Sequence, residues 1–95
     1  MVKFVAKFPI KPECVEEYIA GLRPCVEKTR REPGCLEYTA FFDRETNIST
    51  LMETFADEAA AKTHTEYDYF VRDFSALSKY YAGEPDVEKY SEPLF

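Results

Sequence analysis

The chain has 95 residues, which is enough for one domain and too few for two. Apolar residues make up 45% of it, which is typical of a globular protein. The net charge is −6, so the chain lacks the basic surface that nucleic-acid binding requires. No apolar run approaches the roughly 20 residues that span a bilayer, and residues 1–10 lack the continuous apolar core of a signal peptide. We expect a single cytoplasmic domain, residues 1–95, that binds neither nucleic acid nor membrane.

The first two predicted elements are a strand and a helix. Residues Val2–Ile10 alternate so that one face is fully apolar, which predicts a strand. Residues Glu13–Arg31 carry apolar side chains at spacings of three and four, which predicts an amphipathic helix. Acidic residues in its first turn and basic residues in its last turn suit the helix dipole. Pro24 should bend this helix, and Pro33-Gly34 should end it.

A hairpin is predicted next. Residues Cys35–Arg44 and Ile48–Ala56 alternate in the manner of strands, and the polar residues 45–47 form a short turn between them. Glu53 shares a face of the second of these strands with Leu51 and Phe55. A carboxylate in such apolar surroundings is costly unless it is paired or shifts its pKa.

The rest of the chain predicts a second helical region and a last strand. Asp57 can cap a helix that begins at Glu58, and Thr65 can restart it with Asp68 as the partner in a capping box. An apolar stripe follows, made up of Tyr67, Phe70, Val71, Phe74, Leu77 and Tyr81. Residues Val87–Phe95 then predict a less regular strand.

The predicted order is β-α-β-β-α-β, an α+β sandwich of the ferredoxin-like type. Its two helices can cover only one face of the sheet. The other face carries Val5, Phe41 and Met52 among polar and charged residues, which is too apolar to be left in water. We therefore expect a homodimer in which a second sheet covers this face.

Cys14, Cys25 and Cys35 fit neither a disulfide framework nor a metal site, because their number is odd and their spacing wide. On one helix, Cys14 and Cys25 would lie roughly 16 Å apart, well beyond the reach of a disulfide. We expect three buried free thiols.

Three segments follow one another on this fold: Thr29–Tyr38, Met52–Asp57, and Ala61–His64 with the nearby pair Tyr69-Phe70. In this order they resemble the antibiotic biosynthesis monooxygenase family. Residues Thr29–Tyr38 are similar to the signature after the first helix of that domain. Residues Met52–Asp57 match its strand end, written E-x-aromatic-x-D, and residues Ala61–His64 match its A-x-x-H segment, followed by the aromatic pair Tyr69-Phe70.

The resemblance implies a dimeric α+β barrel, a pocket between each sheet and its helices, and chemistry that uses neither metal nor flavin nor any other cofactor. Members oxidise quinol-like or polyketide-like molecules, degrade haem, or process a signalling molecule. Haem-degrading members use an Asn on the first strand and a Trp in the second helix. This chain has Ala6 and Lys7 on that strand and no Trp, which disfavours haem degradation.

His64 and Glu53 are the candidate catalytic residues. His64 is the only histidine, the side chain that ordinarily changes charge near neutral pH. The same two residues could instead be structural, His64 as a packing or capping residue and Glu53 as a partner of a buried polar group. The candidates for binding a substrate are the aromatic residues Tyr38, Phe55, Tyr69 and Phe70.

We expect a cofactor-independent monooxygenase that acts on a small quinol-like or polyketide-like aromatic molecule. Two alternatives remain. One is an isomerase or processing enzyme for a small phosphorylated signalling metabolite, although the sequence contains no phosphate-binding loop. The other is a non-catalytic, dimeric small-molecule-binding protein.

Overall fold

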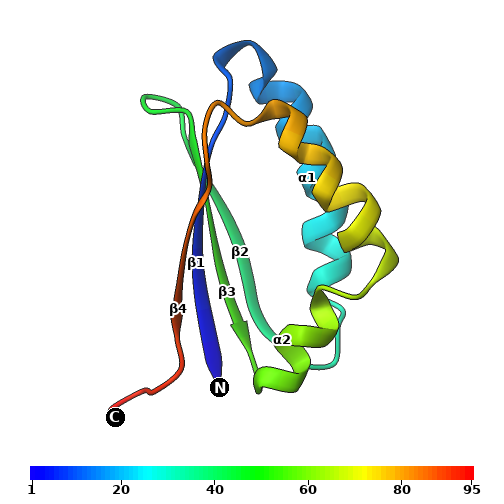
Figure 1. Ribbon diagram of the computed structural model, residues 1–95, viewed down its shortest axis with the longest axis vertical. Helices are drawn as coiled ribbons and strands as arrows, with labels where there is room; N and C mark the ends of the chain where they lie inside the picture. The colour runs from blue at the N-terminus through cyan, green and yellow to red at the C-terminus, as the bar shows by residue number, and fades with distance from the viewer.

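The computed structural model describes residues 1–95 as two layers, a four-stranded sheet and a helical layer that covers one of its faces (Figure 1). Along the chain the elements are β1 (Val2–Pro9), η1 (Pro12–Cys14), α1 (Val15–Thr29), β2 (Cys35–Asp43), β3 (Ile48–Phe55), α2 (Glu58–His64), η2 (Tyr69–Phe74), η3 (Ser75–Tyr80) and β4 (Asp86–Tyr90).

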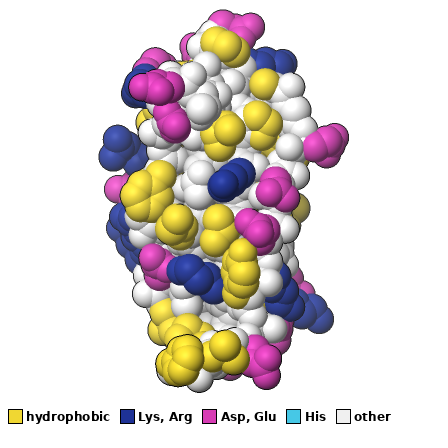
Figure 2. All heavy atoms as spheres, turned by 90° about the vertical axis from the view of Figure 1, so that its left-hand side faces the viewer, with side chains coloured by type: hydrophobic (Ala, Val, Ile, Leu, Met, Phe, Trp, Pro, Cys, Tyr) yellow, Lys and Arg dark blue, Asp and Glu magenta, His cyan; other side chains and the backbone are white.

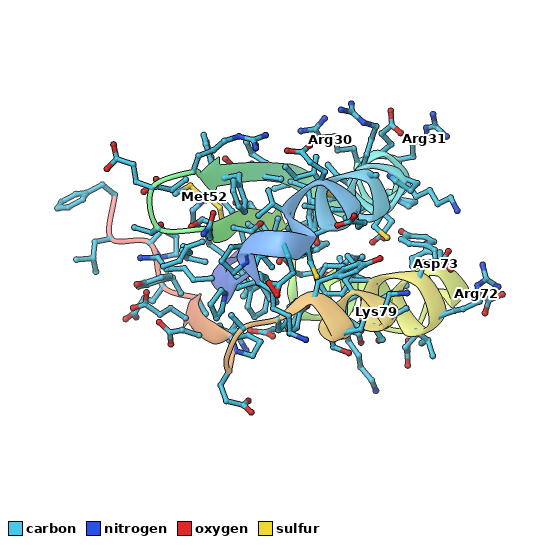
Figure 3. All side chains as sticks on the ribbon, turned by 90° about the horizontal axis from the view of Figure 1, so that it is seen from above. Arg30, Arg31, Met52, Arg72, Asp73 and Lys79 are labelled. Carbon is cyan, nitrogen blue, oxygen red and sulfur yellow. The ribbon has the colours of Figure 1, made fainter.

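The strand order in the sheet is β2-β3-β1-β4, and every neighbouring pair is antiparallel. β3 therefore lies between β1 and β2, the two strands that α1 connects. This is the ferredoxin-like arrangement, so the predicted α+β fold is confirmed. α1 and the η2–η3 segment run side by side on one face of the sheet (Figure 3).

The core lies between these layers and follows the predicted apolar faces. Val2, Ala6 and Phe8 of β1 are buried and Phe4 is half-buried, and most of the apolar stripe of α1 is buried as well. Leu51 and Phe55 of β3 are completely buried beneath them. One polar pair is built into this core, in which the hydroxyl of Tyr18 donates a 2.8 Å hydrogen bond to Oγ of Ser49.

The first helix is shorter than predicted. Pro12–Cys14 form a separate 3₁₀ turn, η1, and the α-helix runs only from Val15 to Thr29 with Pro24 inside it. After Thr29 the backbone tightens into turns, in which the amides of Arg31 and Glu32 bond to carbonyls three residues earlier. These turns redirect the chain towards β2 and bring Glu32 over the edge of the core.

The second helical region is less regular than predicted. Asp57 does cap α2, since its side chain accepts a 2.8 Å hydrogen bond from the amide of Ala60. Thr65 does not restart the helix, because its hydroxyl donates to the carbonyl of Lys62 instead. η2 is a π-helical turn and η3 a 3₁₀ segment, so the predicted stripe loses its register and Val71 is 60% exposed.

The last strand is also shorter than predicted. β4 covers Asp86–Tyr90, pairs only with β1 and forms an edge of the sheet. Residues 91–95 belong to no strand, and Leu94 and Phe95 are exposed. None of the helices has the length and apolar composition needed to cross a membrane. All three cysteines are free, but only Cys25 is buried, so the expectation of three buried thiols is wrong for Cys14 and Cys35.

The outer face of the sheet has no cover within the chain. Apolar side chains lie there in separate patches between charged ones (Figure 2), and Met52 lies on this side, away from the helices (Figure 3). Val5 and Met52 are directly paired neighbours. At one end of this face, the ammonium of Lys3 lies 2.6 Å from the carboxylate of Glu37.

Candidate active site

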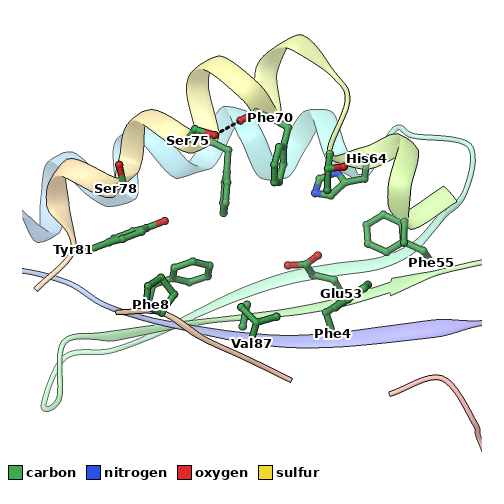
Figure 4. A pocket seen from close by; sticks show the side chains of 15 residues that line it. Phe4, Phe8, Glu53, Phe55, His64, Phe70, Ser75, Ser78, Tyr81 and Val87 are labelled. Atoms are coloured by element: carbon green, nitrogen blue, oxygen red, sulfur yellow. Dashed lines mark hydrogen bonds between the residues drawn. The ribbon is translucent and has the colours of Figure 1, made fainter. Parts of the chain in front are cut away.

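A cavity of about 510 Å³ lies between the sheet and the second helical region (Figure 4). β1, β3 and β4 supply its floor, and α2, η2 and η3 supply its roof. Most of the lining is apolar, and it includes the aromatic rings of Phe4, Phe8, Phe74 and Tyr81. A volume in the range of roughly 300–1,000 Å³ is typical of small-molecule sites.

Glu53 is the only Asp, Glu, Lys or Arg side chain that lines this cavity. The alternation of β3 directs it inward with Leu51 and Phe55, and its neighbours across the sheet are Phe4 and Tyr38. Burial, and to a lesser extent the negative charge of Glu32, raise the pKa of the Glu53 carboxyl from 4.5 to about 7. Glu53 can therefore exchange a proton near neutral pH.

His64 ends α2 and points into the same cavity, with the Glu53 carboxylate on the opposite wall (Figure 4). Its ring is 4% exposed and is held between aromatic rings, with centroids 5.1 Å from Phe55 and 4.9 Å from Phe70. Nδ1 of His64 lies 2.9 Å from Oε2 of Glu32. Nε2 is buried and has no hydrogen-bond partner.

Glu32 is a site residue that sequence reasoning did not single out. Its side chain is buried, and its carboxylate contacts both His64 and the hydroxyl of Tyr69. In the sequence, Glu32 stands between two arginines and Pro33-Gly34, which is typical of an exposed helix end. The signal that could have found it is its place inside the segment Thr29–Tyr38, which resembles the family signature.

The structure divides the predicted aromatic residues into two groups. Phe55 and Phe70 line the cavity, whereas Tyr38 and Tyr69 do not. Tyr38 is buried beside the His64 ring, at a centroid distance of 5.6 Å, and burial raises the pKa of its hydroxyl. Tyr69 donates its hydroxyl hydrogen to Glu32. These two tyrosines thus contact the residues around His64 and lie outside the cavity wall.

The lining contains no Lys or Arg, and no three His, Cys, Asp or Glu side chains converge in a way that could hold a metal ion. What the cavity offers is an apolar space for a small molecule, two titratable groups that face each other across it, and the hydroxyls of Ser75, Ser78 and Tyr81 along its length. This arrangement can bind a neutral aromatic molecule and move a proton at one end of it.

The sequence matches the model of a known protein family. The model of the antibiotic biosynthesis monooxygenase domain matches residues 1–73. The chain belongs to the antibiotic biosynthesis monooxygenase family. The three segments that resemble the family signatures meet in this chain: Glu53 and His64 line the cavity, and Glu32 contacts His64.

Similarity to individual proteins agrees with the family. "Putative monooxygenase YcnE" of Bacillus subtilis is 34% identical over 71 residues, 74% of this chain and 75% of YcnE. "Uncharacterized protein sll1783" of Synechocystis is 36% identical over 62 residues, 64% of this chain but only 42% of sll1783. The chain therefore spans less than half the length of sll1783. A solved structure of an antibiotic biosynthesis monooxygenase has a TM-score of 0.91 at 30% identity, with 98% of this chain and 99% of that chain covered.

Proposed function

We propose that this protein is a cofactor-independent monooxygenase that oxidises a small quinol-like or polyketide-like aromatic molecule in the cavity. The observation that carries the proposal is the pairing of Glu53, whose pKa is about 7, with the unpartnered Nε2 of His64 across an apolar space. Groups that titrate near the working pH are the ones suited to general acid–base catalysis. Membership of the monooxygenase family supports the same reaction class.

In the proposed reaction, the substrate supplies the electrons. A side chain of the protein accepts a phenolic proton, and the resulting anion passes an electron to O₂ before the two radicals combine. The hydroperoxide that forms then loses water. Overall, a CH₂ carbon becomes a carbonyl carbon, one oxygen atom enters the substrate, and the other leaves as water with the two hydrogens. The four electrons lost by the carbon are the four that O₂ gains.

The charge of the cavity favours this substrate class over a phosphorylated metabolite. The lining contains a carboxylate and no Lys or Arg, so a phosphate group would be desolvated without a cationic partner. A neutral aromatic ring, in contrast, would bury apolar surface against Phe8, Phe70 and Phe74. The apolar walls also exclude water, which strengthens any electrostatic interaction with a developing phenolate.

We also propose that the protein is a homodimer. The outer face of the sheet presents Val5, Met52 and the 53% exposed ring of Phe41, and the helices of the same chain cannot reach it. A second copy of this sheet offers the same mixture of apolar and charged groups, and a two-fold axis allows such a face to pair with itself. The dimer would also shelter a domain that is small enough to be marginally stable alone.

Oxygen uptake measured with a panel of hydroquinones, hydroxynaphthalenes and anthrones tests the proposed activity. After dialysis against EDTA, the wild type should consume O₂ with at least one of these compounds and release the oxidised product. His64→Ala and Glu53→Gln should lower turnover, and the loss of a proton-transfer group typically costs about 10²- to 10⁴-fold. Glu66→Gln makes the same chemical change on an exposed residue outside the cavity and should keep full turnover.

Two results would contradict the proposal. If both variants turn over like the wild type, neither side chain handles a substrate proton. If an aromatic compound raises the melting temperature in a saturable way but no compound in the panel supports oxygen uptake, the protein is a small-molecule-binding protein rather than a monooxygenase.

A further inference from the structure

We infer that Glu32 is a positioning residue that holds His64 in the tautomer protonated at Nδ1, so that the bare lone pair of Nε2 faces the cavity. The inference deepens the proposed function and rests on it only for the substrate step. It makes His64 the group that accepts the substrate proton and Glu53 the group that can donate one.

The two contacts of the Glu32 carboxylate indicate which nitrogen of His64 carries the proton. An ionised carboxylate has acceptor sites only, so both of its partners must donate to it. Tyr69 can donate only through its hydroxyl hydrogen, and His64 can donate only if Nδ1 carries the proton. A neutral imidazole with a proton on Nδ1 has none on Nε2.

The surroundings of Nε2 indicate that this nitrogen is free to accept a hydrogen bond from a ligand. Nε2 is buried and unpartnered within a ring that is itself 4% exposed. The neighbouring rings of Tyr38, Phe55 and Phe70 offer no conventional hydrogen bond to it. The His64 ring turns into the cavity opposite Glu53 (Figure 4). Since the ring lines the cavity and Nδ1 is bonded to Glu32, Nε2 is the nitrogen that His64 has left to offer a ligand there.

The environment of Glu53 assigns it the complementary role. Its pKa of about 7 means that a large share of the molecules carry a protonated Glu53 at neutral pH. A protonated carboxyl donates a hydrogen bond and cannot take up a further proton. Across the cavity, Nε2 of His64 is thus an acceptor for a phenolic hydrogen, and Glu53 is a donor for an adjacent oxygen that gains negative charge. The pair suits an aromatic ring with a hydroxyl and a carbonyl close together.

NMR of protein labelled with ¹⁵N-histidine tests the tautomer directly. His64 is the only histidine, so the spectrum contains one imidazole. At a pH at which the ring is neutral, the wild type should show a protonated Nδ1 and an unprotonated Nε2. In Glu32→Gln, the side-chain amide can donate to Nδ1, and the population protonated at Nε2 should rise. Glu66→Gln should leave the wild-type tautomer unchanged.

A dominant proton on Nε2 in the wild type would overturn the inference, and so would an imidazole that stays doubly protonated up to the pH of unfolding. Both are decided on the wild type, so a Glu32→Gln variant that fails to fold does not leave the question open. A folded Glu32→Gln variant with the wild-type tautomer would also overturn it.

The tautomer needs no substrate, so it separates this inference from the proposed monooxygenase activity. If the tautomer is as expected but no compound supports oxygen uptake, only the proposed activity fails. If uptake occurs, Glu32→Gln should lower kcat by on the order of 10²- to 10⁴-fold, since a histidine in the wrong tautomer cannot act as a base. KM should change little, because Glu32 does not line the cavity. An unchanged kcat would show that the tautomer does not matter for the reaction.

Discussion

Gly34 lies so close to Ala60 that a β-carbon on Gly34 would overlap the side chain of Ala60. The carbonyl of Gly34 also accepts a 2.8 Å hydrogen bond from the amide of Ala56. These contacts join the turn after α1, which carries Glu32, to the start of α2, which carries His64. The absence of a side chain at residue 34 therefore sets the spacing between the two halves of the buried Glu32–His64 pair.

Replacing Gly34 with Ala should destabilise the protein, because the new methyl group meets Ala60 and the backbone must move to admit it. Overpacking of this kind typically costs about 1–3 kcal/mol. Gly83→Ala is the matched control, since its β-carbon would lie at an ordinary 3.6 Å from Cγ of Pro9. In urea unfolding, the free energy of unfolding should be lower than that of the wild type for Gly34→Ala but not for Gly83→Ala. Equal values for the two variants would contradict the close packing at Gly34.

Glu53 should make stability depend on pH. Because the pKa of this carboxyl is raised from 4.5 to about 7 in the folded protein, the native state binds its proton more tightly than the unfolded chain does. Its contribution is greatest below about pH 4.5 and falls as the pH rises towards and through 7, by on the order of 3 kcal/mol in total. Glu53→Gln should remove this pH-dependent loss of stability.

Urea unfolding of the wild type and of Glu53→Gln at pH 5 and pH 8 measures this effect. The free energy of unfolding of the variant relative to the wild type should increase between the two pH values, and the other titrating groups cancel in that comparison. Glu66→Gln should show no such change. A variant that loses as much stability as the wild type between pH 5 and pH 8 would show that Glu53 ionises normally.

The buried hydrogen bond between Tyr18 and Ser49 should contribute to stability as a pair. Tyr18→Phe removes the donor and leaves the Ser49 hydroxyl buried without this partner, which should cost about 1–3 kcal/mol. The double variant Tyr18→Phe/Ser49→Ala should lose less free energy of unfolding than the two single variants lose together, because neither polar group of the pair is then left without its partner. A strictly additive cycle would argue against a direct bond between the two side chains.

Met52→Glu should convert the proposed dimer into a monomer, because it places a charge on the outer face of the sheet beside Val5. The control is Val71→Glu, which introduces the same charge on an exposed residue of the helical layer. Sedimentation velocity at micromolar concentration should give about twice the 11.0 kDa chain mass for the wild type and for Val71→Glu. A wild-type chain that sediments as a stable monomer would refute the dimer.

The sheet and the first helix could be predicted because their signals are local. Alternation along β1 and the three-four spacing in α1 depend only on neighbours in sequence, and the buried faces follow them. The π-helical turn at η2 could not be predicted, because one wide turn shifts the register without changing the composition. Val71 consequently lies in solvent although its spacing matches the buried stripe.

The candidate site was only partly predictable for a related reason. Glu53 could be found because its own strand places it among apolar residues, and His64 because it is the only histidine. Glu32 could not, because its burial depends on His64, which lies 32 residues further along the chain and reaches it only in the folded protein. The catalytic roles of Glu53 and His64 stay predictions until the variants are measured.

The irregular helical geometry of η2 and η3 means that the two walls of the cavity differ in how easily they open. The floor belongs to strands with continuous pairing, whereas the roof beyond α2 consists of a π-helical turn and a 3₁₀ segment, in which backbone hydrogen bonding is weaker than in an α-helix. Backbone amides of residues 69–80 should therefore exchange with solvent deuterium faster than those of β1 and β3. We therefore expect a ligand to enter through the roof. A bound ligand should slow amide hydrogen exchange in residues 69–80 more than in the strands.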